Sequence, residues 1–127
     1  MGDTHQRRVV VAIDGPSGAG KSTIARRLAQ RLGFTYIDTG AMYRAVALWA
    51  QRQDLDVADS YRMEPLARAA DIDLRPGRVF LNGEDITDSI RTPEISNGAS
   101  KVSAIPGVRR AMVEQQQAIG RRSSVVM

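Results

Sequence analysis

The sequence contains no cysteine, which excludes disulfide bonds, thiolate catalysis and metal sites with thiolate ligands. Its only histidine, His5, lies in a polar stretch at the start of the chain, where we interpret it as a solvated tail residue. No apolar run approaches the roughly 20 residues of a membrane-spanning helix, and residues 1–8 lack the hydrophobic segment of a signal peptide. These absences favour a cytoplasmic protein that has no membrane partner.

Lysine is also scarce, because only Lys21 and Lys101 are lysines among the 18 basic residues. With 14 Asp and Glu the net charge is +4, which suits an anionic substrate, and we expect no nucleic-acid partner. The other basic residues are arginines, whose planar guanidinium fork suits phosphate, although a high-GC coding bias would enrich arginine equally well. A chain of 127 residues that is 43% hydrophobic and 25% charged has the composition of one modest globular domain.

Residues 15–22 match the phosphate-binding pattern G-x-x-x-x-G-K-[ST] at every fixed position. The apolar run Val9–Ile13 before them is typical of a parallel strand buried on both faces, and a helical pattern after them ends at Gly33. A strand, a glycine loop and a helix in this order point backbone N–H groups and a helix N-terminus at an anion. Lys21 would then reach the β- and γ-phosphates, and the Ser22 hydroxyl would ligate magnesium. The alternative is a chance match by a glycine-rich turn.

Residues 34–37 predict a second strand that lies beside the first and closes a right-handed strand-helix-strand unit. A carboxylate, a hydroxyl and an arginine follow in residues 38–44, at the sheet edge where open α/β folds bind ligands. The next helix would carry Arg44 in its first turn and Trp49 on its buried side. Asp38 either orients magnesium-bound waters or caps this helix, and the two roles are weighed equally. Thr39 either contributes its hydroxyl to the ligand site or caps the helix.

A polar connector at residues 51–60 is followed by the pattern of a small antiparallel insert. Pro65 is expected to open a helix that reaches Ala70, and residues 72–75 alternate like a half-exposed strand. A Pro-Gly turn then leads into a hairpin whose turn is Asn82-Gly83.

Two more helices and a last strand complete the pattern. Thr92-Pro93 supplies a cap and a first-turn proline for a helix to Ala104, and Pro106 opens another helix that Gly120 should stop. Residues 124–127 predict a strand. The predicted fold class is therefore α/β, a parallel sheet flanked by helices with a small antiparallel β insert.

Four stretches resemble the bacterial cytidylate kinase family, whose members phosphorylate CMP and dCMP. They are IDGPSGAGKST at 13–23, DTGAMYR at 38–44, GEDIT at 83–87 and IRTPE at 90–94. The resemblance implies a P-loop kinase and covers only the N-terminal part of such an enzyme, so we expect a truncated form with little activity alone. By resemblance, residues 1–60 are the first part of the P-loop core, 61–120 the monophosphate-binding region and 121–127 the start of the next core strand.

The resemblance also implies the ligands: ATP with magnesium as cofactor, CMP or dCMP as acceptor, and a monomeric state in the complete protein. The ATP-binding residues would be Gly15, Pro16, Ser17, Gly18, Ala19, Gly20, Lys21, Ser22 and Thr23, with Ser22 as the magnesium ligand. The CMP-binding residues would be Thr39, Tyr43, Arg44, Ser100 and Arg109, with the serine near the cytosine edge and Arg109 on or near the phosphate. Lys21 and Arg44 are the expected catalytic residues, and Arg91 is a secondary candidate for the CMP site.

Other functional classes stay open at this point. Another small P-loop kinase, of adenylate, shikimate or a coenzyme precursor, would share the strand-loop-helix opening. A GTP-binding switch is disfavoured because the sequence has no Asn-Lys-x-Asp motif. The chain could instead be a non-catalytic nucleotide-binding module, and turnover of CMP with ATP, compared with binding alone, separates that class from a kinase.

Overall fold

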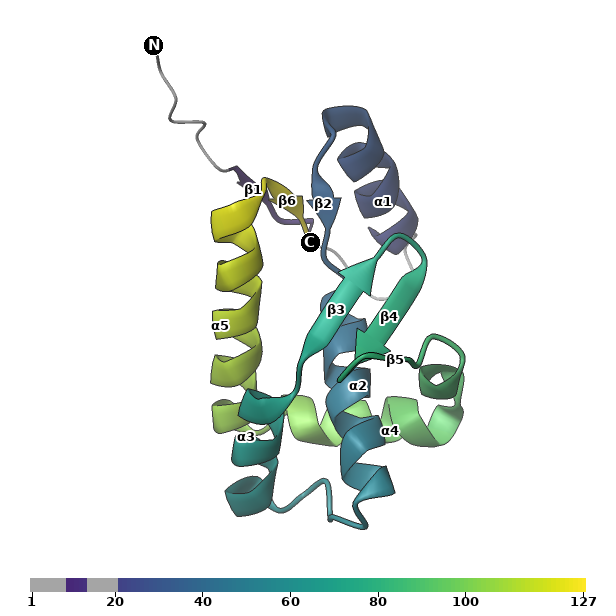
Figure 1. Cartoon of the computed structure of the whole chain (residues 1–127), viewed down its shortest axis with the longest axis vertical. Coiled ribbons are helices and arrows are strands. Elements are labelled where there is room, and N and C mark those ends of the chain that lie inside the picture. The colour runs from purple at the N-terminus through teal and green to yellow at the C-terminus, as the bar shows by residue number, and fades with distance from the viewer. Residues whose placement is uncertain (1–8, 14–20) are drawn as a thin grey trace. The chain divides into compact units, whose positions relative to one another are not determined.

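The structure is a computed structural model that describes residues 9–13 and 21–127 (Figure 1). The chain falls into two units, one made of the residues up to Asp38 together with Gln115–Met127, the other of Thr39–Glu114. In chain order the described elements are β1 (Val10–Val11), α1 (Lys21–Leu32), β2 (Thr35–Tyr36), α2 (Thr39–Arg52), α3 (Ser60–Ala69), β3 (Ile72–Arg75), β4 (Arg78–Leu81), β5 (Glu84–Asp85), the 3-10 helix η1 (Ser89–Arg91), α4 (Pro93–Ser103), α5 (Pro106–Arg122) and β6 (Val125–Val126). None of these helices is both long and apolar enough to cross a membrane.

The first unit is built on a parallel sheet with the strand order β1-β6-β2 (Figure 1). Val125 of β6 pairs with Val10 on one side and with Thr35 on the other, and it is only 1% exposed. The prediction that the second strand lies beside the first is therefore wrong, because β6 inserts between them. A hydrophobic pattern indicates that a segment is a strand, but not which neighbours it takes.

Strand β1 forms an edge of this sheet within the described part of the chain. Val9 and Val10 are 43% and 54% exposed, so the prediction that both faces of Val9–Ile13 are buried is wrong for these two residues. Val11 packs toward Ala25 and Ala29 of α1. A strand that has a neighbour on one side only can cover its apolar residues only in part.

Helix α1 covers one face of the sheet and ends at Gly33, as predicted. Gly33 has φ +67°, a left-handed conformation that glycine adopts without steric cost. Its N–H donates to the Gln30 carbonyl at 3.3 Å, and the Phe34 N–H donates to the Ala29 carbonyl at 2.9 Å. These two bonds are those of a Schellman cap, which turns the chain directly into β2.

The second unit has its core where α2 packs against α4. Met42 and Val46 on α2 are fully buried. Trp49 is only half-buried, so the prediction that it packs in the core is confirmed in part. At the α4 contact, a Cβ on Gly98 would stand 3.2 Å from the Ala47 Cβ, closer than most side chains tolerate. Glycine at this position therefore lets the two helices approach closely.

A three-stranded antiparallel sheet, ordered β3-β4-β5, forms the predicted insert (Figure 1). Ile72 pairs with Leu81 and Phe80 with Asp85. The turn between β4 and β5 has φ +51° at Asn82 and +87° at Gly83. A two-residue hairpin loop with an Asn-Gly sequence requires positive φ at both of its central residues.

Two predicted helix boundaries differ from the structure. Helix α3 begins at Ser60 and contains Pro65 in its interior, because Asp59 caps it earlier by accepting a 3.3 Å hydrogen bond from the Arg62 N–H. Helix α5 continues through Gly120 to Arg122, because that glycine keeps a helical rather than a left-handed conformation. The predicted start of α4 is confirmed, because the Thr92 hydroxyl accepts from the Ile95 N–H at 3.2 Å.

The buried Thr87 hydroxyl ties the end of the insert together. It accepts from the Val79 N–H at 3.0 Å and donates to Asp85 Oδ1 at 2.6 Å. The hydrogen bonds from Thr87 are the main cause of the lowered pKa of Asp85. Thr87 thus satisfies a backbone donor that would otherwise lie buried without a partner.

We expect Thr87→Val to lower the free energy of unfolding by about 1–3 kcal/mol, since the variant keeps the shape but leaves the buried Val79 N–H unpaired. Urea titration followed by circular dichroism measures the change. The exposed Ser96→Ala is the matched control and should be nearly neutral. A loss no greater than that of the control would show that water replaces the hydroxyl.

Candidate functional site

The predicted acceptor-side residues lie on three helices of the second unit. Thr39, Tyr43 and Arg44 belong to the first turns of α2, Ser100 lies on α4, and Arg109 lies on α5. All three residues of α2 are half-buried, while Ser100 and Arg109 are exposed. Helix α2 starts with Thr39 itself, so its positive N-terminal end is close to the hydroxyl and the guanidinium.

Tyr43 and Arg109 meet across α2 and α5. The charge of the Arg109 guanidinium acts on the Tyr43 phenol, and its N–H groups act on the phenol oxygen as hydrogen-bond donors, so the two side chains are neighbours. Burial raises the pKa of Tyr43, and both effects of Arg109 oppose that rise. The pair therefore places an exposed cation and a phenolic hydroxyl side by side, two groups that bind phosphate oxygens.

An open depression of about 420 Å³ lies beside Arg109 on α5. Pro106, Arg110, Val113 and Glu114 also line it. Its volume falls within the range of about 300–1,000 Å³ that small-molecule sites have. Val113 is 44% exposed and lies one turn after Arg109 on the same face of the helix. Val113 is not among the residues predicted from the sequence to line a site, although its spacing of four residues from Arg109 indicates a shared helix face.

The hydroxyl of Ser100 is bonded within α4. Its Oγ donates to the Ser96 carbonyl at 3.3 Å, and the Ser100 carbonyl accepts from the Ser103 hydroxyl at 2.9 Å. Because the Ser100 hydroxyl donates its proton within its own helix, its oxygen lone pairs remain as acceptors. Arg91, the secondary candidate, is exposed at the end of η1, where its N–H donates to the Asp88 carbonyl at 3.2 Å.

The predicted donor side belongs to the first unit and lies largely outside the described residues. This applies to Gly15–Gly20 and to the side chains of Lys21 and Ser22. The backbone of α1 begins at Lys21, where the motif predicts a helix N-terminus behind a phosphate loop. Thr23 is exposed in the first turn of the same helix.

Comparison with known proteins agrees with this arrangement. A family model described as cytidylate kinase matches residues 11–127. The chain is 72% identical over 127 residues to the cytidylate kinase of Solibacter usitatus, covering 100% of this chain and 55% of that protein. It is 53% identical over 119 residues to the cytidylate kinase of Caldanaerobacter subterraneus, covering 94% of this chain and 53% of the relative. It is also 50% identical over 134 residues to the bifunctional pantoate ligase/cytidylate kinase of Gloeobacter violaceus, covering 100% of this chain and 26% of that protein.

A parallel α/β unit whose first helix follows the sequence G-x-x-x-x-G-K-S defines a P-loop nucleotide-binding protein. Within that class, the chain belongs to the cytidylate kinase family. The resemblance and the α/β fold class are thereby confirmed, and this family is favoured over the other small kinases. The chain spans about half the length of the cytidylate kinases that it matches.

Removing the Arg109 charge should raise the pKa of Tyr43 further, since the opposing effect of burial would remain. Because the pKa of Tyr43 is higher in the folded state than in the unfolded chain, the folded protein keeps the phenolic proton up to a higher pH. The free energy of unfolding therefore falls as pH rises between the two pKa values, and Arg109→Gln widens that window. Titration of the tyrosine ring 13C signals measures the shift. Tyr61, which is 88% exposed, is the internal control, and an unchanged Tyr43 signal would contradict the pairing.

Proposed function

We propose that this chain supplies the ATP phosphate loop and the CMP-binding region of a kinase that transfers the γ-phosphate of ATP to CMP or dCMP. Family membership supports this function. In the structure, the Tyr43–Arg109 pair supports it most directly, because it holds an exposed cation beside an open depression on the predicted acceptor unit. The activity is proposed for the complete kinase, since the chain spans about half the length of its relatives.

On the donor side, the loop amides from Gly15 to Thr23 would surround the ATP phosphates, and Lys21 would follow the charge onto the transferred group. Among the described residues no group of three or more His, Cys, Asp or Glu could hold a metal ion. The proposed ligand is instead the Ser22 hydroxyl together with phosphate oxygens and water, a donor set that suits magnesium. Magnesium bound with ATP would neutralise charge on the β- and γ-phosphates. Asp38 would orient its waters or cap α2.

On the acceptor side, Arg109 and Arg44 would counter the charge of the CMP phosphate, with Thr39 and Tyr43 donating hydroxyl hydrogen bonds. An oxygen of that phosphate is the nucleophile, so two anionic groups must approach each other. The protein's task is then mostly positioning and charge neutralisation. The position of Arg44 near the N-terminus of α2 adds the helix dipole to this task.

The Ser100 hydroxyl would give a physical reason for a preference for cytosine. Its hydroxyl proton is used by the Ser96 carbonyl, which leaves oxygen lone pairs to accept a hydrogen bond. Cytosine offers an exocyclic amino donor, whereas uracil has a carbonyl acceptor at the same position. A bound uracil would therefore face an acceptor or would have to break the Ser100–Ser96 bond.

The test is conversion of CMP to CDP with ATP. It uses a chimera in which this chain is joined to the part of the Solibacter usitatus relative that it does not cover. Lys21→Ala should lower kcat by about a hundred- to a thousand-fold, as loss of one preorganised donor does. Lys101→Ala removes the other lysine and serves as the control. A change below about threefold in Lys21→Ala would exclude Lys21 from transition-state stabilisation, and absence of turnover in the unmodified chimera would contradict the proposed function.

Arg109→Ala in the same chimera should raise KM for CMP more than KM for ATP, because its proposed contact is with the acceptor phosphate. Each KM is measured with the other substrate saturating. Loss of one charge-assisted hydrogen bond predicts an increase of roughly ten- to a hundredfold. Equal increases for both substrates would assign Arg109 to the fold or to a closure step.

A further inference from the structure

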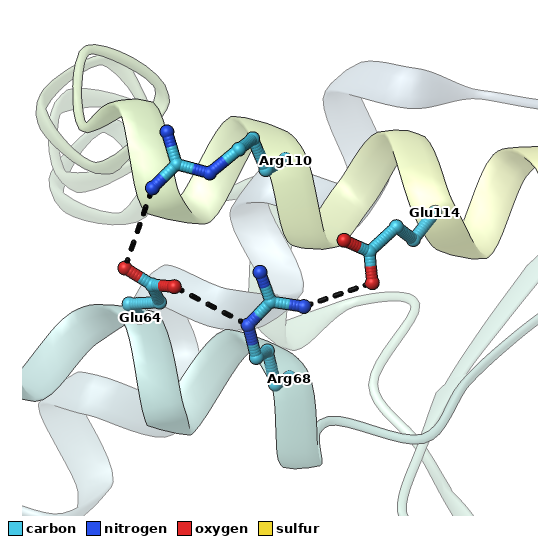
Figure 2. A network of polar contacts seen from close by, with 4 residues as sticks. All are labelled: Glu64, Arg68, Arg110 and Glu114. Carbon is cyan, nitrogen blue, oxygen red and sulfur yellow. Dashed lines mark hydrogen bonds and ion pairs between the residues drawn. The ribbon is translucent and has the colours of Figure 1, made fainter.

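Four charged side chains form a row that connects α3 with α5 (Figure 2). Arg110 Nη2 lies 3.7 Å from Glu64 Oε1, and Glu64 Oε2 lies 3.3 Å from Arg68 Nε. Arg68 Nη1 then reaches Glu114 Oε1 at 2.8 Å. The signs alternate along the row, so every neighbouring pair attracts. Arg68 and Glu64 from α3 therefore hold α5 at Arg110 and again one turn later at Glu114.

Gly107 adds a contact of a different kind at the start of α5. A Cβ built on this buried glycine would overlap the Glu64 carboxylate and the end of its side chain. Glycine thus lets Glu64 lie directly against the first turn of α5, where the helix dipole favours a negative charge. Steric fit and charge agree in placing this carboxylate at the N-terminus of α5.

Arg109 lies between these contacts on the same helix. Its guanidinium acts on the Tyr43 phenol of α2, whereas the neighbouring Arg110 pairs with Glu64 of α3. A rotation of α5 about its axis would break the row at Arg110 and Glu114, would separate Gly107 from Glu64, and would carry Arg109 away from Tyr43. The position of Arg109 is thus coupled geometrically to the contacts on α3.

We propose that Glu64 and Arg68 are positioning residues, which fix the rotation of α5 so that Arg109 faces Tyr43 and the acceptor phosphate. That Arg109 faces the acceptor phosphate rests on the proposed function. All four side chains are 37–62% exposed, and ion pairs this exposed contribute little to stability individually. The role of the row is therefore to set geometry, and a purely stabilising role is the alternative that the experiment must separate.

The first measurement needs no substrate. In the 127-residue chain, Glu64→Gln and Arg68→Gln should raise the Tyr43 pKa in the same direction as Arg109→Gln, because a loosened Arg109 acts less on the phenol. Arg62→Gln is the matched control, since Arg62 lies on the same helix and pairs at 3.8 Å with Asp59 of its own cap. Amide spectra confirm that each variant is folded.

The second measurement uses the kinase chimera. Glu64→Gln and Arg68→Gln should raise KM for CMP about two- to fivefold, the size expected for exposed pairs, with KM for ATP unchanged. Gly107→Ala should reproduce the Tyr43 shift and this KM increase. In a Glu64→Ala background, Gly107→Ala should have no further effect, because Glu64→Ala removes the side-chain atoms that the added methyl group would overlap. If Gly107→Ala does not fold, the Glu64 and Arg68 variants decide the question.

The outcomes separate the two proposals. A Tyr43 signal that is unchanged in Glu64→Gln and Arg68→Gln overturns the positioning role, whatever the kinetics. A shifted Tyr43 signal with an unchanged KM for CMP supports positioning of Arg109 and contradicts its assignment to the acceptor phosphate. A shifted Tyr43 signal together with a raised KM for CMP supports both proposals. If the effects of Gly107→Ala and Glu64→Ala then add, the added methyl group does not act through Glu64, and the proposed steric contact between Gly107 and Glu64 is overturned.

Discussion

The parallel hydrogen bonds of β6 are the constraint on which the first unit depends. The Val125 N–H donates to the Val9 carbonyl at 2.9 Å on one side, and the Ile37 N–H donates to the Val126 carbonyl at 2.7 Å on the other. Without β6, neither β1 nor β2 would have a partner among the described residues. Because β6 pairs with β2 although residues 39–114 lie between these strands in the sequence, those residues form one long excursion that leaves the first unit and returns to it.

Charge is divided between the two units in a way that fits their proposed tasks. The segments 1–38 and 115–127 contain eight Lys and Arg and three Asp and Glu, whereas Thr39–Glu114 contains ten and eleven. The excess positive charge thus belongs to the unit with the phosphate loop, which would bind the highly charged ATP. In the second unit arginines such as Arg52, Arg68 and Arg78 pair with carboxylates.

Local patterns predicted much of the fold because their causes are local. The Schellman cap at Gly33, the cap at Thr92 and the tight turn at Asn82-Gly83 each depend on a few neighbouring residues, and each is confirmed. Predictions failed where one local signal competed with another. Pro65 resembled a helix start, but the Asp59 cap begins α3 earlier, and Gly120 resembled a stop inside a helix that continues.

The sequence alone determined the phosphate-loop motif, the family and the elements that carry each candidate residue, because these follow from residue type and spacing. Only the tertiary structure decided that β6 separates β1 from β2, that Arg109 meets Tyr43, and that Glu64 lies against Gly107. Tyr43 and Arg109 are 66 positions apart in the sequence. Contacts of this kind depend on how helices rotate and pack against one another, and the periodicity of a single segment carries no information about its partner.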